Sequence, residues 1–165
     1  TAMNPCPCGY ATDPKHECRC THQQITRYRS KISGPLLDRI DLHVEVPAVP
    51  FKDLSHLPPA EDSSHIRHRV IAARQLQWKR FRKSTKYCNA QMDSSSIRAA
   101  CKLDDQCHTI LEAAVDKFGF SARTYFRILK IARTIADLSS ESGIGTHHIS
   151  EAIQYRTMDR NTAGP

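Results

Sequence analysis

The sequence predicts a mainly α-helical chain in which a short loop-and-strand segment precedes a helical bundle. Three observations support this class. The first 34 residues are rich in turn-forming dipeptides such as Asn4-Pro5 and Asp13-Pro14. Residues 40–46 alternate between apolar and polar side chains, which is typical of a β-strand. From Ser63 onward, apolar residues recur with a helical period over several segments.

The composition limits the classes of protein that are possible. Of the 165 residues, 39% are hydrophobic, which suffices for a core that we place mostly in the C-terminal half. No run of 18 apolar residues occurs, and residues 1–10 lack the basic and apolar regions of a signal peptide. Seven cysteines, four of them clustered, are not typical of a secreted disulfide scaffold. We therefore expect a cytoplasmic protein with reduced or metal-bound thiols and no membrane partner.

The segment 1–62 is expected to hold little regular structure. A short basic helix is predicted over 23–32, and a strand is predicted over 40–46. Residues 47–60 contain four prolines and are predicted to form an extended linker. One strand needs pairing partners, and none is obvious here. The segment is therefore predicted to be the remnant of a larger α/β core, with Thr1 as a boundary within a longer protein.

The segment 63–160 is predicted to form an all-α bundle. Its signals are apolar stripes bounded by capping residues and glycines. Ser63 or Ser64 would cap the first helix, Gly119 would end the third, Ser121 would cap the fourth, and Thr146 would cap the last. The predicted helices cover residues 63–81, 95–102, 104–118, 122–138 and 147–157.

Four cysteines stand in two Cys-x-Cys pairs near the start of the chain. They are Cys6, Cys8, Cys18 and Cys20. Four thiolates can hold a structural Zn²⁺ in a closed tetrahedral site, which would fold a loop too polar to form its own core. His16 or His22 could replace one sulfur. Free reduced thiols and two strained disulfides are the alternatives.

A basic span follows the linker. The formal net charge is +7, and residues 63–92 contain no Asp or Glu. Such a field attracts polyanions, so a nucleic-acid surface is predicted; the alternative is a solvated helix face beside an acidic neighbour. Trp78 lies in the same span, and we expect it to anchor the helix to the bundle rather than to stack on a base. The predicted nucleic-acid contacts are Arg67, Arg74, Lys79, Arg80, Arg82 and Lys83.

Three long phrases together resemble one known family. They are AMNPCPCGY, RYRSKISGPLLDRIDLHVEVP and SARTYFRILKIARTIADL. The chain is similar to the Mg-chelatase-like AAA+ ATPases of the ComM/YifB type over nearly its whole length. The resemblance implies that 1–62 is a remnant of the AAA+ α/β core and that 63–160 is its helical lid. No G-x-x-x-x-G-K-[ST] occurs, so this polypeptide alone is expected to be unable to hydrolyse ATP.

The resemblance assigns roles in nucleotide chemistry to three residues. Asn4 matches sensor 1, which orients the attacking water, although Asn-Pro is also an ordinary turn dipeptide. Arg39 matches the arginine finger, which would reach the ATP of a neighbouring subunit; the alternative is a local ion pair with an adjacent Asp. Arg123 matches sensor 2, one turn into the helix that follows Ser121, where an exposed helix arginine would look the same.

The resemblance implies ATP-driven remodelling of single-stranded or branched DNA in competence, by a ring that is expected to be a hexamer and to use ATP and Mg²⁺. Chelatase-like remodelling of a protein partner is one alternative. A stand-alone zinc-binding nucleic-acid module is another, and the unpaired strand argues against it. A thiol-redox sensor built on the cysteine pairs is a third alternative.

Overall fold

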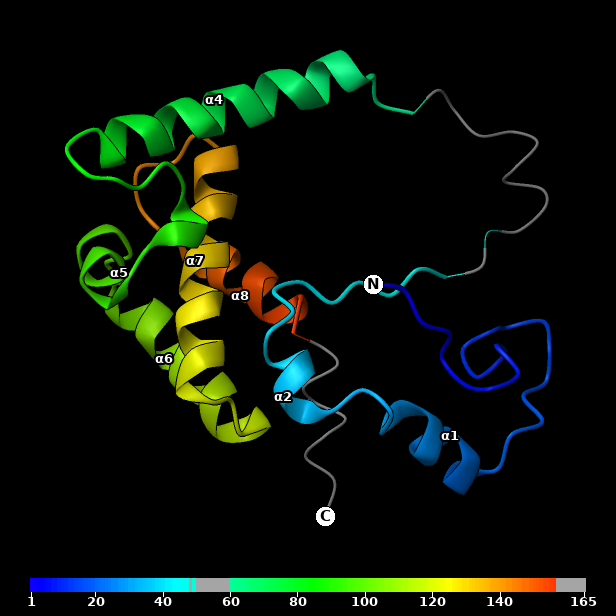
Figure 1. The fold of residues 1–165 in the computed structure, drawn as a ribbon. Coiled ribbons are helices and arrows are strands. Elements are labelled where there is room, and N and C mark those ends of the chain that lie inside the picture. Colours follow the sequence, from blue (N-terminus) through cyan, green and yellow to red (C-terminus); the bar gives the residue numbers. More distant parts are fainter. Residues whose placement is uncertain (48, 50–59, 157–165) are drawn as a thin grey trace. The chain divides into compact units, whose positions relative to one another are not determined.

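The computed structural model describes residues 1–47, 49 and 60–156, and it divides the chain into two compact units. Unit 1 comprises Thr1–Ile40 with Val44–Pro59, and unit 2 comprises Asp41–His43 with Ala60–Pro165. The elements that the structure describes are helical (Figure 1), which confirms the mainly α prediction. Among these residues, no helix is both long enough and apolar enough to cross a membrane.

Unit 1 contains two short helices. Helix α1 (His22–Arg29) starts at Thr21, which forms a capping box with Gln24, so it begins and ends earlier than predicted. Helix α2 (Gly34–Leu37) was not predicted; Pro35 near its N-terminus favours this single turn. Helix α1 buries none of its residues, and α2 buries only Leu37. These helices therefore contribute very little apolar core to unit 1.

The strand predicted over residues 40–46 is wrong, because the described residues form no strand. A strand is stabilised by a ladder of backbone hydrogen bonds to a neighbouring strand, and the described residues provide no such neighbour. Val44 and Val46 from the apolar side of the alternation are 66% and 86% exposed. His43 from its polar side is buried, and its backbone N–H donates to the Tyr155 carbonyl oxygen in unit 2.

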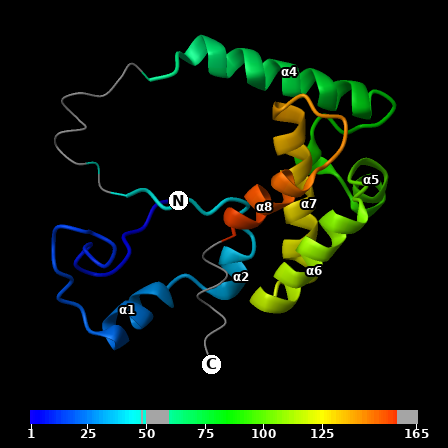
Figure 2. The same cartoon turned by 180° about the vertical axis from the view of Figure 1, so that it is seen from behind.

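Unit 2 is a helical bundle built around one central helix, α7 (Ala122–Leu138). Helix α7 packs against four other elements of the unit, and α4 crosses its C-terminal end (Figure 1). The view from behind shows α8 beside α7 (Figure 2), where these two helices share the largest interface of the bundle. The remaining elements are α4 (Ser63–Phe81), the 3₁₀ turn η1 (Asn89–Gln91), α5 (Ser94–Ala100), α6 (Asp105–Phe118) and α8 (Thr146–Gln154).

Local capping signals explain where these helices begin and end. The predicted helices over 104–118 and 122–138 agree with α6 and α7 to within one residue. Asp104 and Ser121 accept the N-cap hydrogen bonds, and Gly119 ends α6 in the left-handed conformation at φ 62°. Asp62, rather than Ser63 or Ser64, caps α4. The N-cap position of α8 is Gly145, one residue before the predicted Thr146.

A continuous apolar core holds unit 2 together. Ile128, Leu129 and Ala132 of α7 are at most 4% exposed, and they meet buried side chains from α6 and α8. Burial of a Leu or Ile side chain stabilises a fold by roughly 1.5–3 kcal/mol. The partners contributed by α6 and α8 are Cys107, Leu111, Ala114, Ile149, Ala152 and Ile153.

Candidate metal centre and basic helix surface

The four clustered cysteines converge in unit 1. Cys6 Sγ lies 3.3 Å from Cys8 Sγ and 3.7 Å from Cys18 Sγ, and the Cys8–Cys18 separation is 3.6 Å. Cys20 completes the group, in which all ligand atoms lie within 4.8 Å of one another. Cys6 is fully buried and the other three are half-buried. The two Cys-x-Cys pairs, separated by ten residues from Cys8 to Cys18, are thus brought together by the loop between them.

Two backbone features shape this loop. Gly9 N–H donates to the Cys6 carbonyl oxygen, and Gly9 adopts φ +86°, which an L side chain rarely tolerates. The Arg29 side chain of α1 donates to the Pro5 carbonyl oxygen at 3.2 Å. His16 pairs with Asp13 at 3.1 Å and is not a member of the cysteine group that could hold a metal.

The donor set fits a tetrahedral metal ion. Zn–S bonds of about 2.3 Å place the sulfurs of a regular tetrahedron about 3.8 Å apart, close to the separations found here. All four thiols are free of disulfides. Hydrogen bonds from the Tyr10 backbone and from Cys6 lower the pKa of Cys8 to about 6. The hydrogen bond to Cys8, together with burial, raises the pKa of Cys20 to about 12.

The second candidate region is the surface of α4. From Ser63 to Ala72 every side chain of this helix is exposed, and burial begins at Ala73. Ile66 and Val70 continue the face that buries Ala73, Gln77 and Phe81, yet they are 43% and 45% exposed. Both ribbon views show the N-terminal half of α4 extending beyond α7 within unit 2 (Figures 1 and 2). Helix α4 therefore offers a long accessible surface.

Four of the six predicted nucleic-acid contacts lie on α4 or directly after it, and their side chains have neither a hydrogen-bond partner nor a carboxylate partner among the described residues. They are Arg67, Lys79, Arg82 and Lys83, all exposed. Arg74 is also exposed and donates to the Gln77 amide oxygen at 3.2 Å. Arg69 on the same helix pairs with Glu61 at 2.7 Å, which reduces its charge locally. The cationic surface that remains is dense because no acidic residue lies between 63 and 92.

Arg80 occupies a different environment from the other predicted contacts. Its guanidinium makes two hydrogen bonds to the Asp137 carboxylate of α7, at 2.7 and 2.5 Å, and one to Asn89 at 2.8 Å. Arg133 also donates to the Asp137 carboxylate, at 3.2 Å, and to the carbonyl oxygens of Glu141 and Ser142. Arg80 thus helps to dock α4 on α7.

Asp137 is the centre of this polar network. Burial alone would raise the pKa of the Asp137 carboxyl, but hydrogen bonds from Arg80 and Asn89 hold that pKa below its ordinary value. Sequence reasoning missed this residue. One sequence feature could have indicated its role. Asp137 is the single acidic residue of α7 and follows Arg133 by four residues, a spacing that places the two side chains next to each other on a helix.

Trp78 does not anchor the helix, contrary to expectation. Its side chain is 57% exposed, whereas Phe81, three residues later, is 7% exposed and provides the aromatic anchor. The Arg82 guanidinium carbon lies 5.9 Å from the Trp78 ring centroid, within cation–π range. The apolar period alone could not distinguish these two aromatic residues.

The three predicted nucleotide-contacting residues are distributed over both units. Asn4 and Arg39 are exposed residues of unit 1, and the Arg39 guanidinium donates to the Pro35 carbonyl oxygen at 2.7 Å. Arg123 is an exposed residue in the first turn of α7 in unit 2. Their roles as sensor 1, arginine finger and sensor 2 therefore stay predictions.

A loop at the end of α7 carries another cluster of titratable groups. His147 Nε2 and His148 Nε2 lie 3.4 and 3.6 Å from a Glu141 carboxylate oxygen. Gly145 N–H donates to His148 Nδ1 at 2.9 Å, which requires the His148 proton to sit on Nε2. A metal bound at Nε2 needs the opposite tautomer, so this arrangement favours a neutral capping histidine over a metal ligand.

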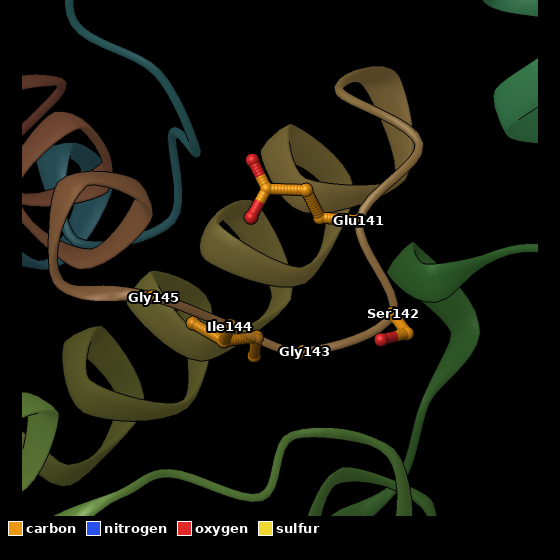
Figure 3. Close-up of a pocket in the computed structure, with 5 residues that line it drawn as sticks. All are labelled: Glu141, Ser142, Gly143, Ile144 and Gly145. Carbon is orange, nitrogen blue, oxygen red and sulfur yellow. The ribbon is translucent and has the colours of Figure 1, made fainter.

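The same loop lines a hollow in the surface of unit 2. Glu141, Ser142, Gly143, Ile144 and Gly145 surround it (Figure 3). Only two of these residues have polar side chains, and Ile144 is buried in the core. The hollow therefore offers few groups for recognising a ligand.

Comparison with known proteins places the chain in a family. A family profile described as magnesium chelatase, subunit ChlI C-terminal, matches residues 60–156, and one described as magnesium chelatase, subunit ChlI, matches residues 1–54. The first match alone covers more than half of the sequence. The chain belongs to the magnesium chelatase ChlI family.

Individual relatives confirm the predicted resemblance to the ComM/YifB type. The chain is 43% identical over 160 residues to the competence protein ComM of Haemophilus influenzae and 42% identical to YifB of Escherichia coli. It is 33% identical over 155 residues to Rv2897c of Mycobacterium tuberculosis. These alignments cover 94–96% of this chain but 30% of each relative, so the chain spans less than a third of their length.

Proposed function

We propose that this chain is part of an AAA+ ATPase that couples ATP hydrolysis to the remodelling of DNA, and that the α4 surface holds the DNA. The observation that carries the proposal is the exposed cationic surface of α4, with no acidic residue from 63 to 92. Similarity to a protein named for competence supports it, since competence is the uptake of DNA.

Electrostatics supplies the physical reason. DNA carries a high density of phosphate charge with condensed counterions, which cationic side chains displace on binding. Arg67, Lys79, Arg82 and Lys83 are exposed on or beside one helix, so several phosphates can be neutralised at once. Arg80 is not included in the proposed contact surface, because its guanidinium is held by Asp137 and Asn89.

Binding of a fluorescein-labelled DNA oligonucleotide at several salt concentrations tests this surface. For about four phosphate contacts, the logarithm of affinity should fall with the logarithm of salt with a slope of about −3 to −4, which is about 100-fold between 50 and 200 mM. The triple variant R67A/K79A/K83A should lose most of the affinity and show a smaller slope. R98A, which removes an exposed arginine from α5, is the matched control. Salt-independent binding would contradict the proposal.

The proposed nucleotide chemistry uses three side chains of this chain together with a phosphate cradle from elsewhere in the protein. Asn4 as sensor 1 would orient the attacking water, and Arg123 as sensor 2 would contact the γ-phosphate in the same subunit. Arg39 as arginine finger would reach the ATP of a neighbouring subunit in a ring, proposed to be a hexamer. ATP and Mg²⁺ supply the transferable phosphoryl group and the charge that neutralises it.

Steady-state ATP hydrolysis by the full-length protein tests these assignments. R39A should reduce turnover by about 10³-fold or more, the usual size of an arginine-finger effect. Because the finger acts between subunits, mixing R39A subunits with wild-type subunits should reduce the activity of the wild-type sites as well. R98A should leave turnover unchanged. Normal turnover in both R39A and R123A would contradict the assignments.

The cysteine group is proposed to hold a structural Zn²⁺. Cys6, Cys8, Cys18 and Cys20 would occupy all four positions, which leaves none for a reacting water. The ion would supply folding free energy to a loop that buries almost no apolar surface. The site would thus fix the segment that carries Asn4, two residues before its first ligand.

A further inference from the structure

The outward face of α4 combines arginines with apolar side chains. Arg67, Ile71, Arg74, Trp78 and Arg82 are separated by four, three, four and four residues, so they form one stripe at 3.6 residues per turn. Each of the five is exposed. The stripe is distinct from the face that packs on α7, which is formed by Ala73, Gln77 and Phe81.

The position of Trp78 in this stripe needs a physical explanation. A tryptophan left 57% exposed forfeits much of the stability that burial of its large ring would give. Among the described residues Trp78 does not belong to the apolar core of unit 2, whereas Phe81 does. Arginines stand one turn before and one turn after it, about 6 Å away along the helix axis.

We propose that Trp78 stacks on an unpaired base of single-stranded DNA, while Arg74 and Arg82 contact the phosphates on either side. An aromatic ring flanked by cations is the arrangement that proteins use to bind single strands, because every base offers a π-face. In a duplex the faces of the bases are covered by their neighbours, so a ring on a straight helix surface has nothing to stack on. The inference rests on the proposed DNA surface and adds a preference for unpaired segments.

The chain has a built-in probe for this contact, because Trp78 is its only tryptophan. The experiment titrates the protein with single-stranded oligo(dT) and, separately, with a blunt duplex of equal length at low salt. Stacking should quench tryptophan fluorescence with oligo(dT) and leave it nearly unchanged with the duplex. Labelled-oligonucleotide anisotropy should show tighter binding of the single strand.

Variants distinguish stacking from mere proximity. W78A should weaken oligo(dT) binding by about 10-fold or more and leave duplex binding unchanged, whereas W78F should retain most of the affinity. Y87A is the matched control, since Tyr87 is 63% exposed and lies outside the stripe. Circular dichroism checks that W78A is folded; if it is not, the wild-type quenching and the wild-type preference for oligo(dT) over the duplex still decide the question.

Three results would overturn the inference. If the single strand and the duplex bind with equal affinity and neither quenches the fluorescence, Trp78 does not stack on a base. The proposed salt-dependent DNA surface would still stand. If oligo(dT) quenches the wild-type fluorescence but W78A binds oligo(dT) as tightly as the wild type, the Trp78 ring does not contribute to binding. Binding to neither nucleic acid removes the proposed DNA surface and this inference together, and it would favour remodelling of a protein partner.

Discussion

The two units hold their residues in place by different means. Unit 2 buries an apolar core that α6, α7 and α8 share, whereas the buried hydrophobic residues described in unit 1 are Cys6 and Leu37. A segment with so little buried apolar surface cannot offset the conformational entropy lost on folding. With the proposed Zn²⁺ bound, unit 1 would be held by ligation of its cysteines, whereas unit 2 is held by packing of its apolar core.

The two units also differ in how deeply their paired polar side chains are buried. In unit 2 the Asp137 carboxylate is fully buried and is surrounded by Arg80, Arg133 and Asn89. In unit 1 the Asp13 carboxylate and the His16 ring lie 3.1 Å apart on an exposed loop. Removing a charge from a buried network costs far more than removing one from a surface pair.

The largest effect is expected from removing metal. Apparent binding energies of structural Zn²⁺ sites are about 10–16 kcal/mol, so chelation or C6S should unfold the cysteine-rich loop. Limited proteolysis should then cleave between residues 1 and 33, while the thermal unfolding of unit 2 stays unchanged. C88S, which removes a half-buried thiol outside the cluster, is the control. Freshly purified protein with no metal would contradict the proposed site.

Next in size is the loss of the buried carboxylate. D137N leaves Arg133 and Arg80 without their anionic partner, which should lower the free energy of unfolding by about 3–5 kcal/mol. Urea denaturation followed by circular dichroism measures it. E61Q removes the partner of Arg69 from an exposed pair and should cost less than about 1 kcal/mol. Similar costs for the two variants would show that burial of Asp137 has little energetic consequence.

A smaller effect is expected where α6 ends. Gly119 has φ 62°, and a Cβ added there meets no atom within 4 Å, so the cost of G119A comes from the backbone alone. A left-handed alanine should destabilise unit 2 by about 1–2 kcal/mol. G143A is the matched control, because a Cβ at Gly143 also meets nothing and its φ is not in the left-handed region. Equal unfolding midpoints for both variants would contradict this reasoning.

The smallest effect concerns the buried histidine of α8. Burial, followed by repulsion from His147, lowers the pKa of His148 below its ordinary 6.5. The unfolded chain therefore binds the proton more readily, so this contribution to stability is complete above pH 6.5 and declines as the pH falls toward the folded pKa. Urea unfolding at several pH values should show a weaker decline for H148N than for the wild type. An unchanged pH dependence in H148N would exclude His148 as its source.

Much of the fold follows from local signals. Asp104, Gly119 and Ser121 mark where α6 and α7 start and stop, and capping depends on residues within one turn of the helix end. The prediction of a strand over 40–46 was wrong because alternating apolar and polar residues form a strand only where a neighbouring strand is present to pair with them. The convergence of the cysteines also follows from sequence, because two close pairs joined by a short loop are brought together easily.

The sequence by itself determined the helical class, the helix ends set by their caps, the metal-type cysteine spacing and the cationic character of the span 63–92. Only the tertiary structure decided which side chains of that span face outward. The Arg80 guanidinium is held by the Asp137 carboxylate, 57 residues away in sequence, whereas Trp78 is exposed and Phe81 is buried. The physical reason is that propensity and capping act within a turn or two, whereas the burial of a charge or a ring depends on the element packed against it.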